Sequence, residues 1–303
     1  MDIYLPIAGQ SVNAIFIVIL GFLVGLLSGM FGVGGGFLTT PLLIFYGIPP
    51  TVAVASATTQ ITGARVSGVM VHMRRGGVDL KMAGVMIVGG LAGSFVGAGL
   101  FRLLQSTGRI DVVIGALYVL ILGSIGALML KDALVALGYV TPPSTTKKTE
   151  RHNRWVAALP LRWRFYSSGL YVSPLAPVAL GFVAGILTVL LGIGGGFILV
   201  PAMIYLLGMA ARVVIGTSLV MILAVSAATT MVHALTTRSV DIVLAALLLV
   251  GGVIGAQYGA ILATRVKPDL LRLALAVIIL LVGLRMALGL AWHPDEVYSI
   301  EYL

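Results

Sequence analysis

Long stretches of this chain are apolar from end to end, and short polar or charged segments separate them. We expect five apolar pieces in the first half, at about 12–30, 36–47, 52–72, 80–103 and 110–131. The second half repeats the series at about 175–191, 196–208, 214–236, 241–263 and 270–291. Helices of about 20 apolar residues cross the hydrocarbon core of a bilayer, which is about 30 Å thick. The pattern therefore predicts an all-α integral membrane protein, and the second piece of each half, being short, a re-entrant or half-helix segment.

The two halves are copies of one unit. Residues 21–41 return at 181–201 without a gap, and ten of these 21 positions are identical. The match continues beyond this segment, because His72 aligns with His233 and the glycines at 89, 93 and 97 align with those at 251, 255 and 259. We therefore divide the chain into a first transmembrane repeat (1–131), a polar and basic connector (132–173) and a second transmembrane repeat (174–303). Internal duplication is a common way of building transporters.

The low charge content excludes a water-soluble globule. Only 10% of the residues are charged, against roughly 25% in soluble domains, and the mean hydropathy is +1.12. The net charge of +9 is explained by the basic residues that gather in the cytoplasmic loops of membrane proteins, so we expect the lipid bilayer as a partner and no nucleic acid. The chain has no cysteine, and its histidines are not clustered with other ligands, so we expect no metal and no cofactor.

The distribution of Lys and Arg predicts the sidedness of the chain. If the short piece of each repeat either returns to its own side or crosses fully together with its partner, the other three helices make the number of crossings odd. An odd number of crossings places the second repeat upside down relative to the first, so the repeats are inverted. With the N-terminus outside, 14 basic residues fall in inner loops and 3 in outer loops, whereas a parallel arrangement gives 11 against 6. The inverted arrangement follows the positive-inside rule better. We expect periplasmic N- and C-termini and a cytoplasmic connector in a bacterial inner membrane.

The candidate site starts from the two glycine runs. Each run precedes a short apolar helix, where glycine permits tight turns and unusual backbone angles, and where the N–H groups at a helix start favour an anion. Arg65 lies well within its predicted helix, and a charge inside a membrane is costly unless it faces a cavity or a partner. The alternative reading is that the glycines only pack helices, that the hydroxyls bond to their own helix backbone or to a neighbouring helix, and that Arg65 extends to the cytoplasmic surface. The candidate binding residues are Gly34, Gly35, Gly36, Thr39, Thr40, Ser56, Thr59, Gln60, Arg65, Gly194, Gly195, Gly196, Thr217 and Ser218.

Catalytic chemistry is not expected. All ten carboxylates fall in tails, loops or helix ends, so the chain shows neither a reacting combination of side chains nor a carboxylate proton relay. His72 and His233 sit at matching helix ends, where we expect polar roles rather than metal binding.

The motif Gly-x-Gly-Gly-Gly-Phe-(x)3-Pro, present at 32–41 and again at 192–201, resembles that of the sulfite exporter TauE/SafE family of membrane permeases. The resemblance covers nearly the whole chain. It implies transport of a small anion such as sulfite, sulfoacetate, thiosulfate or a related organosulfonate or carboxylate. We expect alternating access around a site near the bilayer midplane, where the repeats meet. A channel-like anion pore stays open as an alternative, and a membrane scaffold or an intramembrane enzyme is a weaker one. The substrate, the coupling ion, the direction of flux and the oligomeric state, with a homodimer as one option, also stay open.

Overall fold

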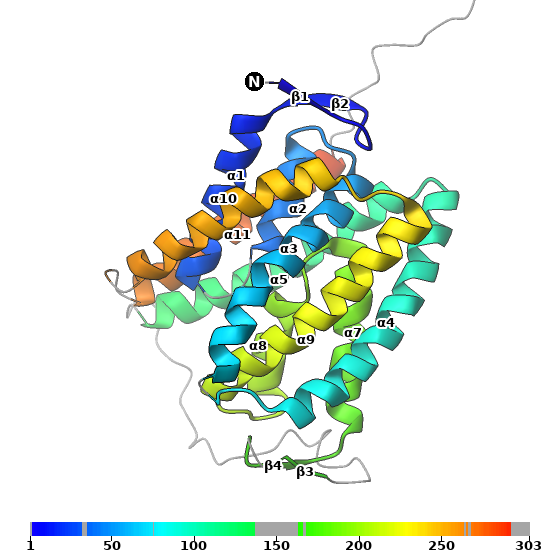
Figure 1. The fold of residues 1–303 in the computed structure, drawn as a ribbon. Helices are drawn as coiled ribbons and strands as arrows, with labels where there is room; N and C mark the ends of the chain where they lie inside the picture. The colour runs from blue at the N-terminus through cyan, green and yellow to red at the C-terminus, as the bar shows by residue number, and fades with distance from the viewer. Residues whose placement is uncertain are drawn as a thin grey trace, which may run out of the picture.

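In the described part of the chain, the fold is a bundle of helices with two short β-hairpins (Figure 1). The computed structural model describes residues 2–31, 35–74, 76–136, 163–165, 168–263, 265 and 268–291. The first repeat contains α1 (Ala14–Phe31), α2 (Gly36–Phe45), α3 (Pro50–Arg74), α4 (Leu80–Ser106) and α5 (Ile110–Ala136). The second contains α7 (Leu175–Leu191), α8 (Gly196–Tyr205), α9 (Ala211–Val232) with a π-helical end η1 (His233–Thr237), α10 (Ile242–Ala263) and α11 (Pro268–Ala291). The predicted series of five helical pieces per half is confirmed, with ends shifted by a few residues.

The helices differ in their capacity to cross a membrane. Among the described residues, five segments are long and apolar enough to do so, and they lie in α4, α5, α9 with η1, α10 and α11. The 25-residue helix α3 is long enough, but its hydroxyls, Gln60 and Arg65 make it much less apolar. Helices α2 and α8 have 10 residues each and are too short to span the hydrocarbon core. This composition supports a multi-pass membrane protein.

Two antiparallel hairpins were not anticipated from the sequence. Strands β1 (Asp2–Leu5) and β2 (Gln10–Asn13) precede α1, and β3 (Trp163–Phe165) and β4 (Leu170–Val172) precede α7. The hairpins therefore occupy matching places in the two repeats. Figure 1 shows them at opposite ends of the helical bundle. The connector residues 137–162 lie outside the described part of the chain.

The repeats exchange their helices. The first helix of each repeat packs on the fourth helix of the other, so α1 lies against α10 and α7 lies against α4. Glycines permit the close approach, since a Cβ added at Gly25 would lie 2.2 Å from the Gly252 carbonyl oxygen and one at Gly185 would lie 2.1 Å from that of Gly90. Equivalent helices also pair directly, α3 with α9 and α5 with α11. These helical glycines let neighbouring helices pack closely, as small residues do in membrane proteins.

Two buried carboxylates fasten the hairpins to these exchanged pairs. Asp79 caps α4, where its Oδ1 accepts a hydrogen bond from the Met82 N–H (3.0 Å) and its Oδ2 accepts from the N–H (3.1 Å) and hydroxyl of Ser168. Asp241 precedes α10 and accepts from the N–H groups of Leu244 (3.1 Å) and Ile7 (3.2 Å). The β3–β4 hairpin precedes α7 and is bonded to α4, on which α7 packs. In the same way, the β1–β2 hairpin precedes α1 and is bonded to the start of α10, on which α1 packs. We call these two units the α1–α10 body, with β1–β2, and the α4–α7 body, with β3–β4.

Candidate functional site

A cavity of about 470 Å³ lies between the α1–α10 body and helices α3, α8 and α9. Its inner end is formed by the two glycine segments at Gly35, Gly36 and Gly196. From there it extends to His72 and Ala260, near the C-terminal ends of α3 and α10. Because α3 is followed by Asp79, which contacts the β3–β4 hairpin, the cavity extends toward the end of the molecule that carries this hairpin.

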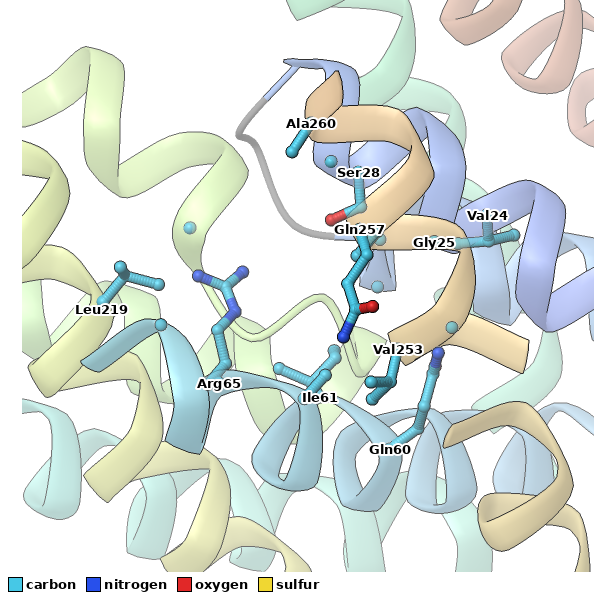
Figure 2. A pocket seen from close by; sticks show the side chains of 18 of the residues that line it. Val24, Gly25, Ser28, Gln60, Ile61, Arg65, Leu219, Val253, Gln257 and Ala260 are labelled. Carbon is cyan, nitrogen blue, oxygen red and sulfur yellow. The ribbon is translucent and has the colours of Figure 1, made fainter. Parts of the chain in front are cut away.

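Among the residues that line the cavity, Arg65 is the only Lys, Arg, Asp or Glu. Figure 2 shows its guanidinium extending from α3 into the open space. The residue is only 9% exposed, and its Nη2 has no hydrogen-bond partner among the described residues. Burying a charged donor without a partner is costly. The missing acceptor is what a bound anion would supply.

Further polar groups enter the cavity from three other directions. Gln257 reaches in from α10 and Ser28 from α1 (Figure 2), and Ser218 lines the wall formed by α9. Gln60 lies at the inner end, where its Nε2 donates to the Leu248 carbonyl (3.4 Å) and its Oε1 accepts from Thr39 (3.2 Å). The remaining wall is largely apolar, with Val24, Ile61, Leu219 and Val253. A mostly apolar pocket with a few converging polar groups is typical of small-ligand sites.

The two glycine segments lie against each other. A Cβ added at Gly36 would lie 2.9 Å from the carbonyl oxygens of Gly192 and Ile193, and Phe37 stacks on Phe197 with ring centroids 4.6 Å apart. The unusual backbone angles that the sequence predicts for the glycine segments are found at Gly195 but not at Gly35. Gly195 has a φ of +68°, whereas Gly35 has a φ of −68°, which any residue can adopt. The role of Gly35 is therefore to leave space, because a Cβ there would lie 2.6 Å from the Val24 side chain.

The predicted site residues fall into three groups. The cavity is lined by Gly35, Gly36, Gln60, Arg65, Gly196 and Ser218. Gly34 lies outside the described residues. The others are not brought to the cavity wall; they are Thr39, Thr40, Ser56, Thr59, Gly194, Gly195 and Thr217.

Most of the hydroxyls away from the cavity connect elements of the fold. Ser56 Oγ accepts from the Asp241 N–H (3.2 Å), and Thr217 Oγ1 accepts from the Asp79 N–H (3.0 Å). Thr59 donates to the Ala55 carbonyl (3.0 Å) and contacts Thr230 of α9. Thr40 Oγ1 lies against Gly192 of the other repeat. The bonds of Ser56, Thr59 and Thr217 fit the structural reading of the hydroxyls, whereas Thr40 Oγ1 has no hydrogen-bond partner among the described residues.

Sequence reasoning missed three polar residues that line the cavity: Ser28, His72 and Gln257. Gln257 carried a signal, since it is an amide within an otherwise apolar helix and its counterpart in the first repeat is Phe95. His72 does have a helix-terminal contact, with Nδ1 3.0 Å from the Gly68 carbonyl, but it also borders the cavity. Among the described residues, no group of three or more His, Cys, Asp or Glu side chains could hold a metal ion.

Comparison with known proteins places this chain in a family. The family model described as sulfite exporter TauE/SafE matches residues 17–286. The probable membrane transporter protein YjnA of Bacillus subtilis strain 168 is 31% identical over 276 residues, which cover 90% of this chain and 99% of that protein. The probable membrane transporter protein YunE of the same organism is 26% identical over 280 residues, which cover 90% of this chain and 96% of that protein. No solved structure gives a significant match.

Proposed function

The chain belongs to the sulfite exporter TauE/SafE family, and from this premise we propose that it is a permease that carries a small anion across the bacterial inner membrane. The relatives are described as probable membrane transporters, and the helices fit a multi-pass membrane protein. Neither finding names the substrate. The proposal of an anion rests on the cavity itself.

The observation that carries the proposal is Arg65. Its guanidinium extends into the cavity, and its Nη2 lacks an acceptor among the described residues. Away from bulk water, one cation with directed N–H donors attracts an anion more strongly than it would at a surface. The carboxamide of Gln257 and the hydroxyls of Ser28 and Ser218 can complete the contacts. Sulfite, sulfoacetate, thiosulfate and related organosulfonates or carboxylates all present the oxygen acceptors that this set of donors would bind.

We further propose that the repeats are inverted and that the cavity faces the cytoplasm. The matching hairpins at opposite ends of the bundle and the reciprocal α1–α10 and α4–α7 pairs support an inverted arrangement. The cavity extends toward the end where α3 finishes in Arg74, within the set of loops that are rich in Lys and Arg. The positive-inside rule assigns that end to the cytoplasm.

Counterflow into liposomes tests the transport proposal. Proteoliposomes preloaded with unlabelled sulfite, thiosulfate, an organosulfonate or a carboxylate would be given the labelled form of the same anion outside. A carrier should accumulate label transiently above equilibrium, and a pore should not. If no anion of the panel showed counterflow while a matched conductance appeared, the channel-like alternative would replace the carrier.

Arg65→Ala is the site-specific arm of that experiment. Hydrogen bonds to charged groups contribute about 1.5–3 kcal/mol, so the loss of Arg65 should weaken apparent affinity about 10- to 150-fold. Arg65→Lys keeps the charge without the planar fork and should give an intermediate value. Arg285→Ala is the matched control, because this exposed arginine lies over the Phe45 ring rather than in the cavity. Unchanged affinity in a well-expressed Arg65→Ala protein would remove the observation on which the anion site rests.

A further inference from the structure

The cavity has a counterpart in the other half of the molecule, and that counterpart is closed. Aligning His72 with His233 pairs the cavity residue Gly68 with Thr229, and aligning Gly93 with Gly255 pairs the cavity residue Ala256 with Ser94. Where Gly68 and Ala256 face open space, Thr229 and Ser94 are fully buried and their hydroxyl oxygens lie 3.3 Å apart. A polar contact therefore fills the place that corresponds to the cavity.

The rest of the counterpart is packed in the same way. The cavity residue Ser28 corresponds to Thr188, which is 1% exposed and donates to the Ala184 carbonyl at 2.7 Å. A Cβ added at Gly90 would lie 2.5 Å from Val225 and 2.9 Å from Met221, so α4 and α9 are in direct contact there. In this half α7 also packs on α9, whereas α1 and α3 lie on opposite walls of the cavity.

The closed region points to the opposite end of the molecule. Helix α9 ends in η1, which leads to Asp241, and Asp241 is bonded to the β1–β2 hairpin. The cavity, in contrast, extends toward the β3–β4 hairpin. Two similar regions, one open toward one end and the other closed toward the other end, are the arrangement that alternating access between inverted repeats requires.

We propose that a second access path runs between the α4–α7 body and α9, that it is closed in this structure, and that Ser94, Thr188 and Thr229 line it when it opens. The inference rests on the proposed transport function and extends it by naming residues on the far side of the route. The path opens when the α4–α7 body moves away from α9, while the α1–α10 body closes on α3. The hydrogen bonds of Asp79 and Asp241 lie within the bodies, so they can persist through this exchange.

The absence of cysteine makes the path testable by single substitutions. Thr229→Cys should react with a membrane-impermeant methanethiosulfonate added from the side of the N-terminal hairpin. Gly68→Cys is the matched variant in the open cavity and should react only from the connector side; a Cβ fits there, since the nearest atom is a Leu219 methyl at 3.6 Å. Ala276→Cys, fully buried in α11, should react from neither side. Ser94→Cys provides a second probe if Thr229→Cys does not fold.

The double variant Ser94→Cys and Thr229→Cys tests whether this contact must open. Oxidation to a disulfide should hold the path closed, so that only a small fraction of the protein can reach the state in which the path is open. Counterflow should then fall about tenfold or more, and reduction of the disulfide should restore counterflow. Full counterflow in the oxidised protein would overturn the proposal. So would labelling of Thr229→Cys and Ser94→Cys from the connector side, or from neither side, in proteins with normal transport.

Failure of this inference can be distinguished from failure of the proposed function. Labelling needs no substrate, so opposite-side labelling of Gly68→Cys and Thr229→Cys would support the second path even if none of the tested anions were carried. Conversely, anion counterflow that depends on Arg65, together with an unreactive Thr229→Cys, would retain the function and reject the path.

Discussion

Replacing Asp79 by Asn should weaken the attachment of the β3–β4 hairpin to α4. The carboxylate accepts hydrogen bonds from the backbone N–H groups of both Met82 and Ser168, one on each oxygen. An amide has one oxygen and one NH₂ group, so in either orientation a donor of Asn would face a backbone donor. The Ser168 hydroxyl can rotate and accept, but a backbone N–H cannot. Asp79→Asn therefore loses one charge-assisted bond and leaves one buried N–H unpaired.

The expected loss is about 2 kcal/mol in the free energy of unfolding, the middle of the range for hydrogen bonds to charged groups. Asp79→Ala removes every acceptor and the helix N-cap as well, so it should cost about 3–5 kcal/mol. For a chain of this size, 1 kcal/mol shifts the midpoint of thermal unfolding by roughly 2–4 °C, which predicts a decrease of about 4–8 °C for Asp79→Asn.

Thermal unfolding of the purified protein in detergent measures this shift. Asp241→Asn should behave similarly, because Asp241 makes the corresponding pair of bonds to Leu244 and Ile7. Asp111→Asn is the control, since this exposed side chain at the start of α5 should change stability by about 0.5 kcal/mol or less. By the same scaling of about 2–4 °C per kcal/mol, a difference below about 1 °C would be less than about 0.5 kcal/mol. If the melting temperatures of Asp79→Asn and Asp111→Asn differed by no more than that, the buried carboxylate would not fasten the hairpin.

Three further outcomes are expected. Gly93→Ala would place a Cβ 2.0 Å from the Phe182 carbonyl oxygen, so α4 and α7 must separate; we expect a cost of about 3 kcal/mol and a smaller monodisperse fraction on size exclusion, which a normal elution profile would contradict. Gly195→Ala should cost about 1–2 kcal/mol in thermal unfolding because φ is +68°, whereas Gly84→Ala, in an open helical position, should stabilise slightly; equal effects would refute the backbone argument. A cysteine replacing Lys148 should react with an impermeant reagent only from the cytoplasm, and labelling of intact spheroplasts from the periplasmic side would reverse the proposed sidedness.

The helices were predictable because their signal is long and repeated. Apolar length alone marks a membrane helix, and the duplication of 21–41 at 181–201 checks each half against the other. The hairpins had no such signal. Their strands have three or four residues, and the alternation that buries Leu5 and Val12, or Phe165 and Val172, is too short to stand out from chance. Their attachment depends on Asp79 and Asp241, which are distant in sequence.

The candidate site was predicted only in part, for a physical reason. Arg65 was identified because a charge within a membrane helix needs a cavity or a partner, and the structure places it on a cavity. A hydroxyl carries no comparable cost, since it can bond to its own helix, to a helix cap or to a ligand. Ser56 and Thr217 were therefore chosen as binding residues although they bond to Asp241 and Asp79. Gln257 lies far along the chain from both glycine runs and from the polar spans that follow them, so the motif does not point to it.

On the proposed mechanism, the differences between the repeats determine which access state is favoured. Two identical repeats would give an inward-open and an outward-open state of equal energy, because exchanging the roles of the halves would leave the structure unchanged. Here Arg65 stands where the second repeat has Ser226, and closing the empty cavity would remove the remaining exposure of a guanidinium whose Nη2 already lacks an acceptor among the described residues, which adds to the cost of burying the charge. The anion that we propose as substrate would supply the missing acceptor and remove that cost. Closure should then depend on the ligand, and an empty carrier should return slowly. We therefore expect exchange of labelled anion to be faster than net efflux, and equal rates would show that Arg65 does not control closure.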